Sequence, residues 1–343
     1  MEETHIRETR GGTQLPETKA PVAYGGQAVI EGVMFAGRTV NVTAVRKKDR
    51  SIAYFESPRI EKAWVARLKK IPFLRGLVAL IDSSAKGSQH LNFSAESYAE
   101  GVAGEDGAAE APKEPEKKSM SDSLTMILGV AVVGVLSFVF GKLVFTLVPA
   151  ALESMLFEGR FESIFLHNLI EGGIKLVLLV GYILLIAQTP LIKRLFQYHG
   201  AEHKVITAYE NGDPLTVENV QKYNTLHYRC GSSFLVLTVL VGILLYSLPI
   251  FTWDTIWERL GIRVLLLPVV IGVSYEVLRF TNSVRDIPLL RYLGYPGLWL
   301  QLLTTKQPTD DQVEVAILSF QRMLEADRNN AVRLVEPSKA VGA

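Results

Sequence analysis

FLVLTVLVGILLYSLPIFTW, residues 234–253, carries no charged side chain over its whole length. A polypeptide needs a helix of about 20 mainly apolar residues to cross the ~30 Å hydrocarbon core of a bilayer. The stretch closes on Phe251 and Trp253, aromatic residues of the kind enriched at the membrane–water interface. We therefore predict a transmembrane helix at residues 234–253.

Three further apolar stretches have the same character. The chain of 343 residues is 48% hydrophobic, and its mean hydropathy is +0.21. Buried core helices of a soluble protein are the alternative, but two of the four runs are too long and too uniformly apolar for that reading. The predicted fold is mostly α, a polytopic membrane protein with about four transmembrane helices and a small cytoplasmic N-terminal unit that contains β-structure. The other predicted spans are Leu124–Val148, Ile170–Ile192 and Val264–Phe280.

The distribution of lysine and arginine predicts the orientation, because cytoplasmic loops carry an excess of both. The segment between the second and third spans and the segment after the fourth are rich in cations, whereas the other two connections are poor in them. Both termini and the loop 193–231 should therefore lie on the cytoplasmic side of the cytoplasmic membrane. The first twenty residues are polar and contain no signal peptide. A reducing compartment suits the lone Cys230.

Composition divides the chain into five parts. We predict a disordered tail at 1–20, a cytoplasmic β/α unit with an amphipathic helix at 21–98 and a flexible linker at 99–121. The membrane domain follows at 122–283 and includes the loop 193–231. A cytoplasmic helical segment and tail occupy 284–343.

Three local patterns refine this division. Residues 39–57, TVNVTAVRKKDRSIAYFES, contain two β-branched runs around a charged turn and predict a hairpin. Residues 60–93 suit either an amphipathic helix on the membrane surface or a packed helix of a soluble subdomain. Near the C-terminus, Thr309 is a candidate N-cap. The apolar positions that follow at helical spacing indicate packing, and they are Val313, Ile317, Phe320 and Leu324.

Metal-ligating residue types gather in the loop 193–231. YHGAEHKVITAYE, residues 198–210, places His199 and His203 four positions apart, on one face of a helix, with Glu202 on the flank of that face. Downstream, HYRCG places His227 and Cys230 three positions apart. Imidazole nitrogen and thiolate sulfur are ligands that suit zinc, and four of them complete a tetrahedron. The loop therefore predicts a zinc site.

Two alternatives accompany the zinc prediction. Histidines at a membrane surface can be interfacial, and a lone cysteine often behaves as a small buried hydrophobe. Residues 199–203 also match H-x-x-E-H, the inverted zinc-protease pattern in which the glutamate is the general base. That pattern requires a downstream carboxylate ligand, for which Glu210, Glu218 and Glu276 are candidates. The chain lacks the large soluble domain of those proteases.

Four stretches, taken in order, resemble the YqhQ-like family of bacterial membrane proteins, a domain of unknown function. They are GGQAVIEGVMF, YHGAEHKVITAYE, HYRCGSSF and PGLWLQLLTT. The resemblance implies a metal-dependent enzyme without an established reaction. The motif positions that it carries over are His199, Glu202, His203, His227, Arg229, Cys230 and Glu31. We expect the N-terminal β unit to pack against the histidine loop, because Glu31 and the nearby glycines need a partner surface and the loop is cationic.

These patterns suggest three different functions. In a metalloenzyme, His199, His203 and a third ligand would bind zinc while Glu202 transfers a proton. In a non-catalytic accessory or scaffold subunit of an envelope or protein-translocation complex, His199, His203, His227 and Cys230 would close a structural zinc site. A transporter is disfavoured by the few charges in the spans. The expected partners are the lipid bilayer and membrane proteins. The net charge of +1 argues against nucleic acid.

Overall fold

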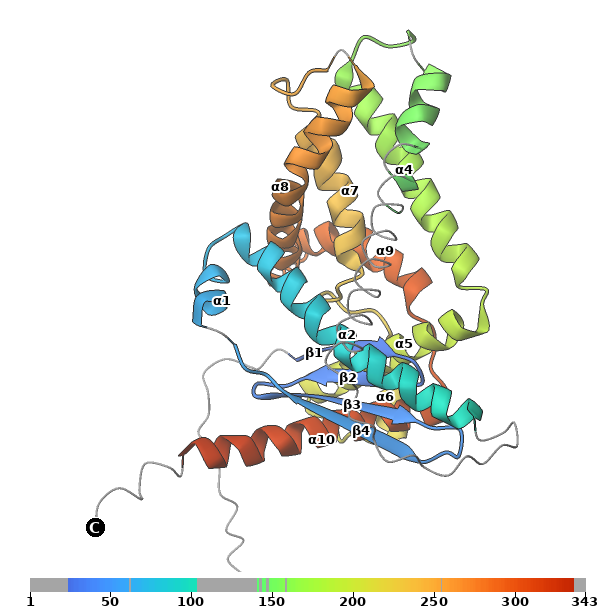
Figure 1. The fold of residues 1–343 in the computed structure, drawn as a ribbon, viewed down its shortest axis with the longest axis vertical. Coiled ribbons are helices and arrows are strands. Elements are labelled where there is room, and N and C mark those ends of the chain that lie inside the picture. Colours follow the sequence, from blue (N-terminus) through green and yellow to red (C-terminus); the bar gives the residue numbers. More distant parts are fainter. Residues whose placement is uncertain are drawn as a thin grey trace, which may run out of the picture.

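The structure is a computed structural model that describes residues 24–61, 63–103, 141, 144–145, 148–157, 159–253 and 255–335. The described part is mostly helical and contains one four-stranded sheet near the N-terminus. Long apolar helices rise from one side of the sheet, and further helices pack around the sheet (Figure 1). These features confirm the mostly α class with an N-terminal β unit. The predicted tail, nearly all of the linker 99–121 and nearly all of the span 124–148 lie outside the described residues.

The sheet is an antiparallel meander in the order β1-β2-β3-β4. The β1–β2 hairpin turns at Ile30 and Glu31, and Glu31 has a φ of +52°, a left-handed conformation that is uncommon outside glycine. The predicted charged turn joins β3 to β4 and contains Arg50, with a φ of +67°. The strands are β1 (Gly25–Val29), β2 (Gly32–Ala36), β3 (Val40–Arg46) and β4 (Ile52–Pro58).

Helices cover both faces of the sheet. On one face, α5 (Pro190–Glu210) and α10 (Asp310–Val335) bury a core that includes Phe35, Tyr198 and Phe320. The apolar stripe predicted around Val313 is confirmed as packing on this core. The other face is covered by the second half of α2 (Leu74–Ala103), which follows α1 (Ala63–Leu68).

The first half of α2 packs against an apolar helix rather than against the sheet. Gly76 lies against the side chain of Tyr275, and Arg75 forms an ion pair with Glu276, both in α8 (Ile256–Ser283). Residues 60–93 thus pack on α8 and on the sheet while Trp64, Phe73 and Ile81 stay exposed, and the amphipathic helix on the membrane surface stays a prediction. Since α2 reaches from α8 to the sheet, it fixes the apolar helices relative to the sheet.

Within the described residues, two helices are long and apolar enough to cross a membrane, namely α4 (Ile164–Ile186) and residues Trp257–Ser283 of α8. In the most apolar window of each helix only 17% and 22% of the residues are buried. A core helix of a soluble protein would be mostly buried, so the exposed apolar faces of α4 and α8 fit a lipid environment better. The remaining helices are 148–157, α6 (Val217–Gln221), α7 (Ser233–Tyr246), η1 (Leu290–Gly294) and α9 (Tyr295–Thr304).

The helix boundaries differ from the predicted spans. The helix expected at 234–253 is α7, which has 14 residues and ends at Tyr246. Its length of about 21 Å is shorter than the hydrocarbon core. Pro249 explains the early end, because a proline disfavours helical conformation in the residue before it. Similarly, α4 ends at Ile186 and Pro190 begins α5, which breaks the expected span 170–192 into two helices.

His90 links α2 to the sheet and makes the packing sensitive to pH. Its ring is fully buried, with Nδ1 2.6 Å from Thr43 Oγ1 and Nε2 2.9 Å from Ser57 Oγ. Burial lowers the pKa of His90 from 6.5 to about 4. The pKa of His90 is therefore lower in the folded protein than in the unfolded chain. The stability that the neutral ring contributes is complete above pH ~6.5 and is lost as the pH falls towards 4.

We expect protonation of His90 to remove about 2 kcal/mol of the free energy of unfolding at pH 5 relative to pH 8. The amide of a His90→Gln variant does not titrate, so the variant should lose less stability over the same pH interval, although it is less stable at pH 8. Thermal unfolding of both full-length proteins at pH 8, 6 and 5 measures the difference. An equal decrease in both proteins would contradict the assignment.

Candidate metal centre

The two histidines of the opening motif lie on one face of α5. Pro190 occupies the first turn of this helix, where a missing backbone N–H costs nothing. His199 and His203 follow one turn apart, and their ring centroids are separated by 4.5 Å. The predicted placement of both imidazoles on one helical face is therefore confirmed.

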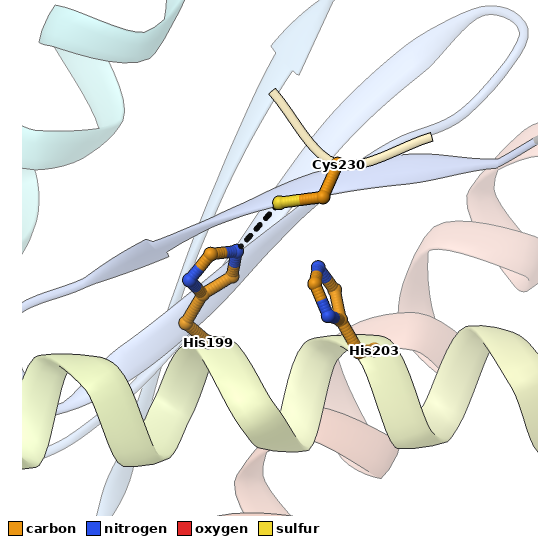
Figure 2. Close-up of side chains that lie close together, drawn as sticks. All are labelled: His199, His203 and Cys230. Carbon is orange, nitrogen blue, oxygen red and sulfur yellow. Dashed lines mark hydrogen bonds between the residues drawn. The ribbon is translucent and has the colours of Figure 1, made fainter. Parts of the chain in front are cut away.

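Cys230 reaches the same point from the turn that precedes α7. Its Sγ lies 3.2 Å from His199 Nε2. Figure 2 shows the two rings rising from α5 with the thiol facing them. The ligand atoms of His199, His203 and Cys230 all lie within 4.8 Å of one another, so the group could hold a metal ion. Donors of a tetrahedral zinc site lie about 2.0–2.3 Å from the ion and about 3.3–3.8 Å from one another. A small contraction of the group would bring its three donor atoms to this spacing.

The hydrogen bonds of the two rings leave one nitrogen of each available to a metal. His199 Nδ1 donates to the carbonyl oxygen of Thr304 at 2.9 Å, and His203 Nδ1 donates to that of Thr225 at 2.5 Å. Such bonds fix the tautomer with a proton on Nδ1 and a lone pair on Nε2, as in many metal-binding histidines. Burial also lowers the pKa of His203, which favours the neutral ring that a ligand must have.

The thiol of Cys230 has donors around it that suit a thiolate. The backbone N–H of Ser232 points at Sγ from 3.4 Å, and the Ser232 hydroxyl lies 3.1 Å from it. The donor set is therefore two imidazole nitrogens and one cysteine sulfur with hydrogen bonds around them, which fits zinc.

Gln301 of α9 holds the cysteine turn in position. Its fully buried amide accepts from His227 N–H at 2.8 Å and donates to His227 O and Ser233 Oγ, both at 2.8 Å. Sequence reasoning missed Gln301, Thr225 and Thr304. The only signal was that PGLWLQLLTT, which includes Gln301 and Thr304, is one of the stretches that carry the family resemblance.

Gly200 allows α5 to approach the chain that follows α9. A Cβ at this position would lie 2.1 Å from the carbonyl oxygen of Lys306. The contact is held from the other side, because Lys306 N–H donates to Phe196 O at 2.9 Å. A larger residue between the two histidines would push away the segment that contains Thr304.

A cleft of about 320 Å³ opens beside the three candidate ligands. Edge strand β1 forms one wall, and the candidate ligands, Glu202, His227 and Arg229 lie on the others. Glu202 is 5% exposed, and it accepts a hydrogen bond from the backbone N–H of Gly26 in β1. Burial raises the pKa of Glu202 to about 7, against the opposing effects of His199 and Gly26. A carboxyl group in this range can both accept and donate a proton at neutral pH.

His227 borders the group without joining it. Its ring centroid lies 5.5 Å from that of His203, but its ligand atoms are not among those that lie within 4.8 Å of one another. His227 Nε2 is buried and has no hydrogen-bond partner in the described part of the chain. Glu210 Oε2 is 4.0 Å away, beyond hydrogen-bonding distance. His227, the fourth predicted ligand, thus lies next to the candidate site, and its Nε2 has an unused lone pair or proton.

The other predicted positions brace the surroundings. Arg229 forms an ion pair with Glu210 and donates to Tyr24 O at 3.4 Å. Glu218 lies 3.6 Å from Lys222, and Glu276 pairs with Arg75. None of the three carboxylates suggested by the protease pattern belongs to the candidate group, whose third member is Cys230.

The N-terminal β unit packs against the histidine segment, as expected. Glu31 at the β1–β2 turn receives two hydrogen bonds of 2.5 Å from Arg194, and the hydroxyl of Tyr198 lies 3.3 Å from its carboxylate. Gly26 of β1 is tight against Glu202, since a Cβ there would lie 3.1 Å from its Cδ. The sheet therefore completes the cleft beside the candidate ligands.

Comparison with known proteins gives a family and a relative. A family model described as "Protein of unknown function (DUF1385)" matches residues 71–326. The "Uncharacterized protein YqhQ" of Bacillus subtilis (strain 168) is 54% identical over 313 residues, which cover 91% of this chain and 96% of the relative. No solved structure matches the chain.

Proposed function

The chain belongs to the DUF1385 family of proteins of unknown function, and from its geometry we propose that it is a metal-dependent enzyme of the cytoplasmic membrane. One observation carries the proposal. His199, His203 and Cys230 converge beside a cleft of about 320 Å³. Catalytic zinc sites keep three protein ligands and an open position, whereas structural sites use four. A cleft beside three ligands favours catalysis.

Each residue of the cleft has a role in this proposal. His199, His203 and Cys230 hold zinc, which when bound polarises an oxygen atom and lowers the pKa of water. Glu202 is not a ligand but lies in the same cleft, where it accepts a proton and returns it. The backbone N–H of Gly26 orients its carboxylate. Hydrolysis is the reaction class that needs these parts.

A structural zinc site in an accessory or scaffold subunit is the second candidate. The observation that favours it is the buried, unpartnered Nε2 of His227. A rotation of this ring towards Cys230 would supply a fourth ligand and close the site. The two candidates therefore differ in whether the ion has an exchangeable position.

Cobalt(II) in place of zinc reports that position directly. We expect the purified full-length protein to bind one cobalt ion with an absorption band of thiolate ligation. Added imidazole should change the visible spectrum, because an open position accepts it. Cys230→Ser should lose the thiolate band, whereas His227→Gln should keep both the band and the stoichiometry. Glu202→Gln, which preserves shape, should bind cobalt as the parent does and lose any hydrolytic activity that the parent shows.

Three results would speak against the proposed enzyme. If added imidazole leaves the cobalt spectrum unchanged and His227→Gln loses the metal, the site is a closed structural one. If Cys230→Ser and His199→Ala both bind metal as the parent does, these residues do not form a metal centre. Weaker cobalt binding by Glu202→Gln, of about 10–100-fold, would make Glu202 a residue that orients a ligand rather than a proton carrier.

We also propose that the chain crosses the membrane four times, with both termini and the metal cleft on the cytoplasmic side. The exposed apolar faces of α4 and α8 support this topology. The C-terminal end of α4, the N-terminal end of α7 and the C-terminal end of α8 all face the sheet (Figure 1). The first predicted crossing, 124–148, lies almost entirely outside the described residues. The excess of lysine and arginine in the segments on the sheet side supports a cytoplasmic position for the sheet.

Single cysteines added at exposed positions test the orientation in intact cells. Asn211→Cys lies at the end of α5, and the matched Arg160→Cys lies in the connection before α4. An impermeant maleimide should label residue 160 from outside and residue 211 only after lysis. The parent, whose Cys230 is buried, gives the background. Labelling of residue 211 in intact cells would reverse the proposed orientation.

A further inference from the structure

Strand β1 is an edge of the sheet, and its residues 25–28 line the cleft beside the candidate metal centre. It lies on the side of the sheet from which the apolar helices rise (Figure 1). Gly25 and Gly26 are exposed, and Gln27 and Ala28 are partly exposed. An accessible edge strand offers its backbone N–H and C=O groups to any other extended chain.

The register of the sheet identifies the backbone groups of β1 that face its free edge. In an antiparallel sheet, alternate residues of a strand bond the neighbour on one side, and the residues between them face the other side. Glu31 accepts from Arg46 N–H at 2.9 Å, so the odd-numbered residues of β2 bond β3 and the even-numbered ones bond β1. Met34 lies opposite Gln27, which is therefore bonded to β2. The two neighbours of Gln27 in β1 direct their N–H and C=O groups to the free edge.

Gly26 and Ala28 are these neighbours. The N–H of Gly26 donates to the carboxylate of Glu202, in agreement with its outward direction. The carbonyl of Gly26 and both backbone groups of Ala28 have no hydrogen-bond partner in the described part of the chain. Two acceptors with a donor between them thus follow the wall of the cleft, as an extended chain requires for pairing.

The opposite edge of the sheet shows how an edge strand is protected from pairing. Strand β4 carries Glu56 and ends at Pro58, and charged residues and prolines on an edge strand oppose pairing with another chain. Strand β1, with the sequence GGQAV, has neither. A Cβ at Gly25 would meet nothing within 4 Å, and glycine in a strand permits close approach of another backbone. The unprotected edge is therefore the one beside the candidate metal centre.

Helix α5 adds apolar contacts to the same cleft. Leu195, Phe196 and Ile206 line it together with the candidate ligands. Successive side chains of an extended chain point in opposite directions, so alternate residues of a bound chain can meet these apolar side chains. The volume of about 320 Å³ lies at the lower end of the range of about 300–1,000 Å³ for ligand pockets. The cleft therefore suits a short extended segment rather than a folded domain.

We propose that the cleft binds an extended peptide, which adds a strand to the free edge of β1. Hydrogen bonds to the backbone of Gly26 and Ala28 hold it, and side-chain contacts with α5 select it. The inference rests on the hydrolase proposed above and makes peptides its substrate class. Because Glu202 already binds the N–H of Gly26, the added strand ends beside Glu202 and the candidate ligands.

Hydrolysis at this position breaks the C–N bond of a peptide group. The oxygen of water bonds to the carbonyl carbon, while Glu202 takes one proton from that water and passes it to the leaving nitrogen. The products are a carboxylic acid and an amine, and no reactant besides water is needed.

Peptide binding and peptide cleavage are measured separately on the purified, zinc-loaded full-length protein. The probe is a fluorescein-labelled pool of randomised hexapeptides, and its control is the same pool with every peptide nitrogen methylated. Fluorescence polarisation reports binding, and mass spectrometry reports cleavage. We expect the unmodified pool to bind with saturation. The methylated pool should bind at least tenfold more weakly, because it has no N–H donors.

Two proline variants test the edge itself. Ala28→Pro removes the outward N–H and leaves the hydrogen bonds between β1 and β2 in place, so it should raise the half-saturating concentration of the pool about tenfold. Tyr54→Pro is the matched control. Tyr54 holds an outward position on the other edge strand, since the odd-numbered residues of β4 bond β3. This variant should bind the pool as the parent does.

The proposal is overturned if both pools bind alike, or if Ala28→Pro binds as the parent does. It is also overturned if the parent does not bind the pool and forms a dimer that Ala28→Pro dissociates, because a second copy then occupies the edge. If the proline variants fail to fold, the comparison of the two pools on the parent decides.

The two readouts separate this inference from the proposed function. Binding that depends on β1 without any cleavage supports the peptide site and speaks against the hydrolase. Zinc-dependent hydrolysis of a small ester without peptide binding supports the hydrolase and overturns the peptide site.

Discussion

Two hydrogen bonds to backbone carbonyls determine what the cleft can do. His199 donates to Thr304 and His203 donates to Thr225, and both bonds originate at Nδ1. Without them each ring could turn its Nδ1 lone pair or its Nε2 proton towards Cys230, and the three groups would not present three lone pairs to one point. The carbonyls belong to two segments that lie side by side, since Thr305 Oγ1 donates to Thr225 Oγ1 at 3.3 Å, and the rings are fixed only when both segments are in place.

Much of the surrounding fold serves to hold those two segments. Gly200 lets the chain after Thr304 approach α5 at backbone distance, and Gln301 clamps the turn that carries Cys230. Edge strand β1 closes the remaining side and binds Glu202 through Gly26. The sheet and the helices packed on it thus build the site, while α7 and α9 connect it to the apolar helices. This arrangement places the cleft close to the sheet-side ends of α4 and α8.

The parts of this arrangement that depend on local spacing could be predicted from the sequence. The histidine pair needed only the period of a helix, and the hairpin around Arg50 needed only alternating β-branched residues and a polar turn. The contacts that orient the rings could not be predicted, because they use main-chain carbonyls, which every residue offers. Thr304 is 105 positions from His199. Likewise, Arg259 of α8 donates to Glu171 of α4 from 88 positions away, which no local pattern indicates. Pro249 is a local signal for the early end of α7, but a span predicted from hydropathy alone does not take the proline into account.

The proposed function depends on two imidazoles and one thiolate binding a single zinc ion. X-ray absorption at the zinc edge of the purified full-length protein measures this directly. We expect one sulfur at about 2.3 Å, two imidazole nitrogens at about 2.0–2.1 Å and an oxygen or nitrogen atom as the fourth neighbour. A shell of oxygen and nitrogen without sulfur, or a shell with no imidazole scattering, would contradict it.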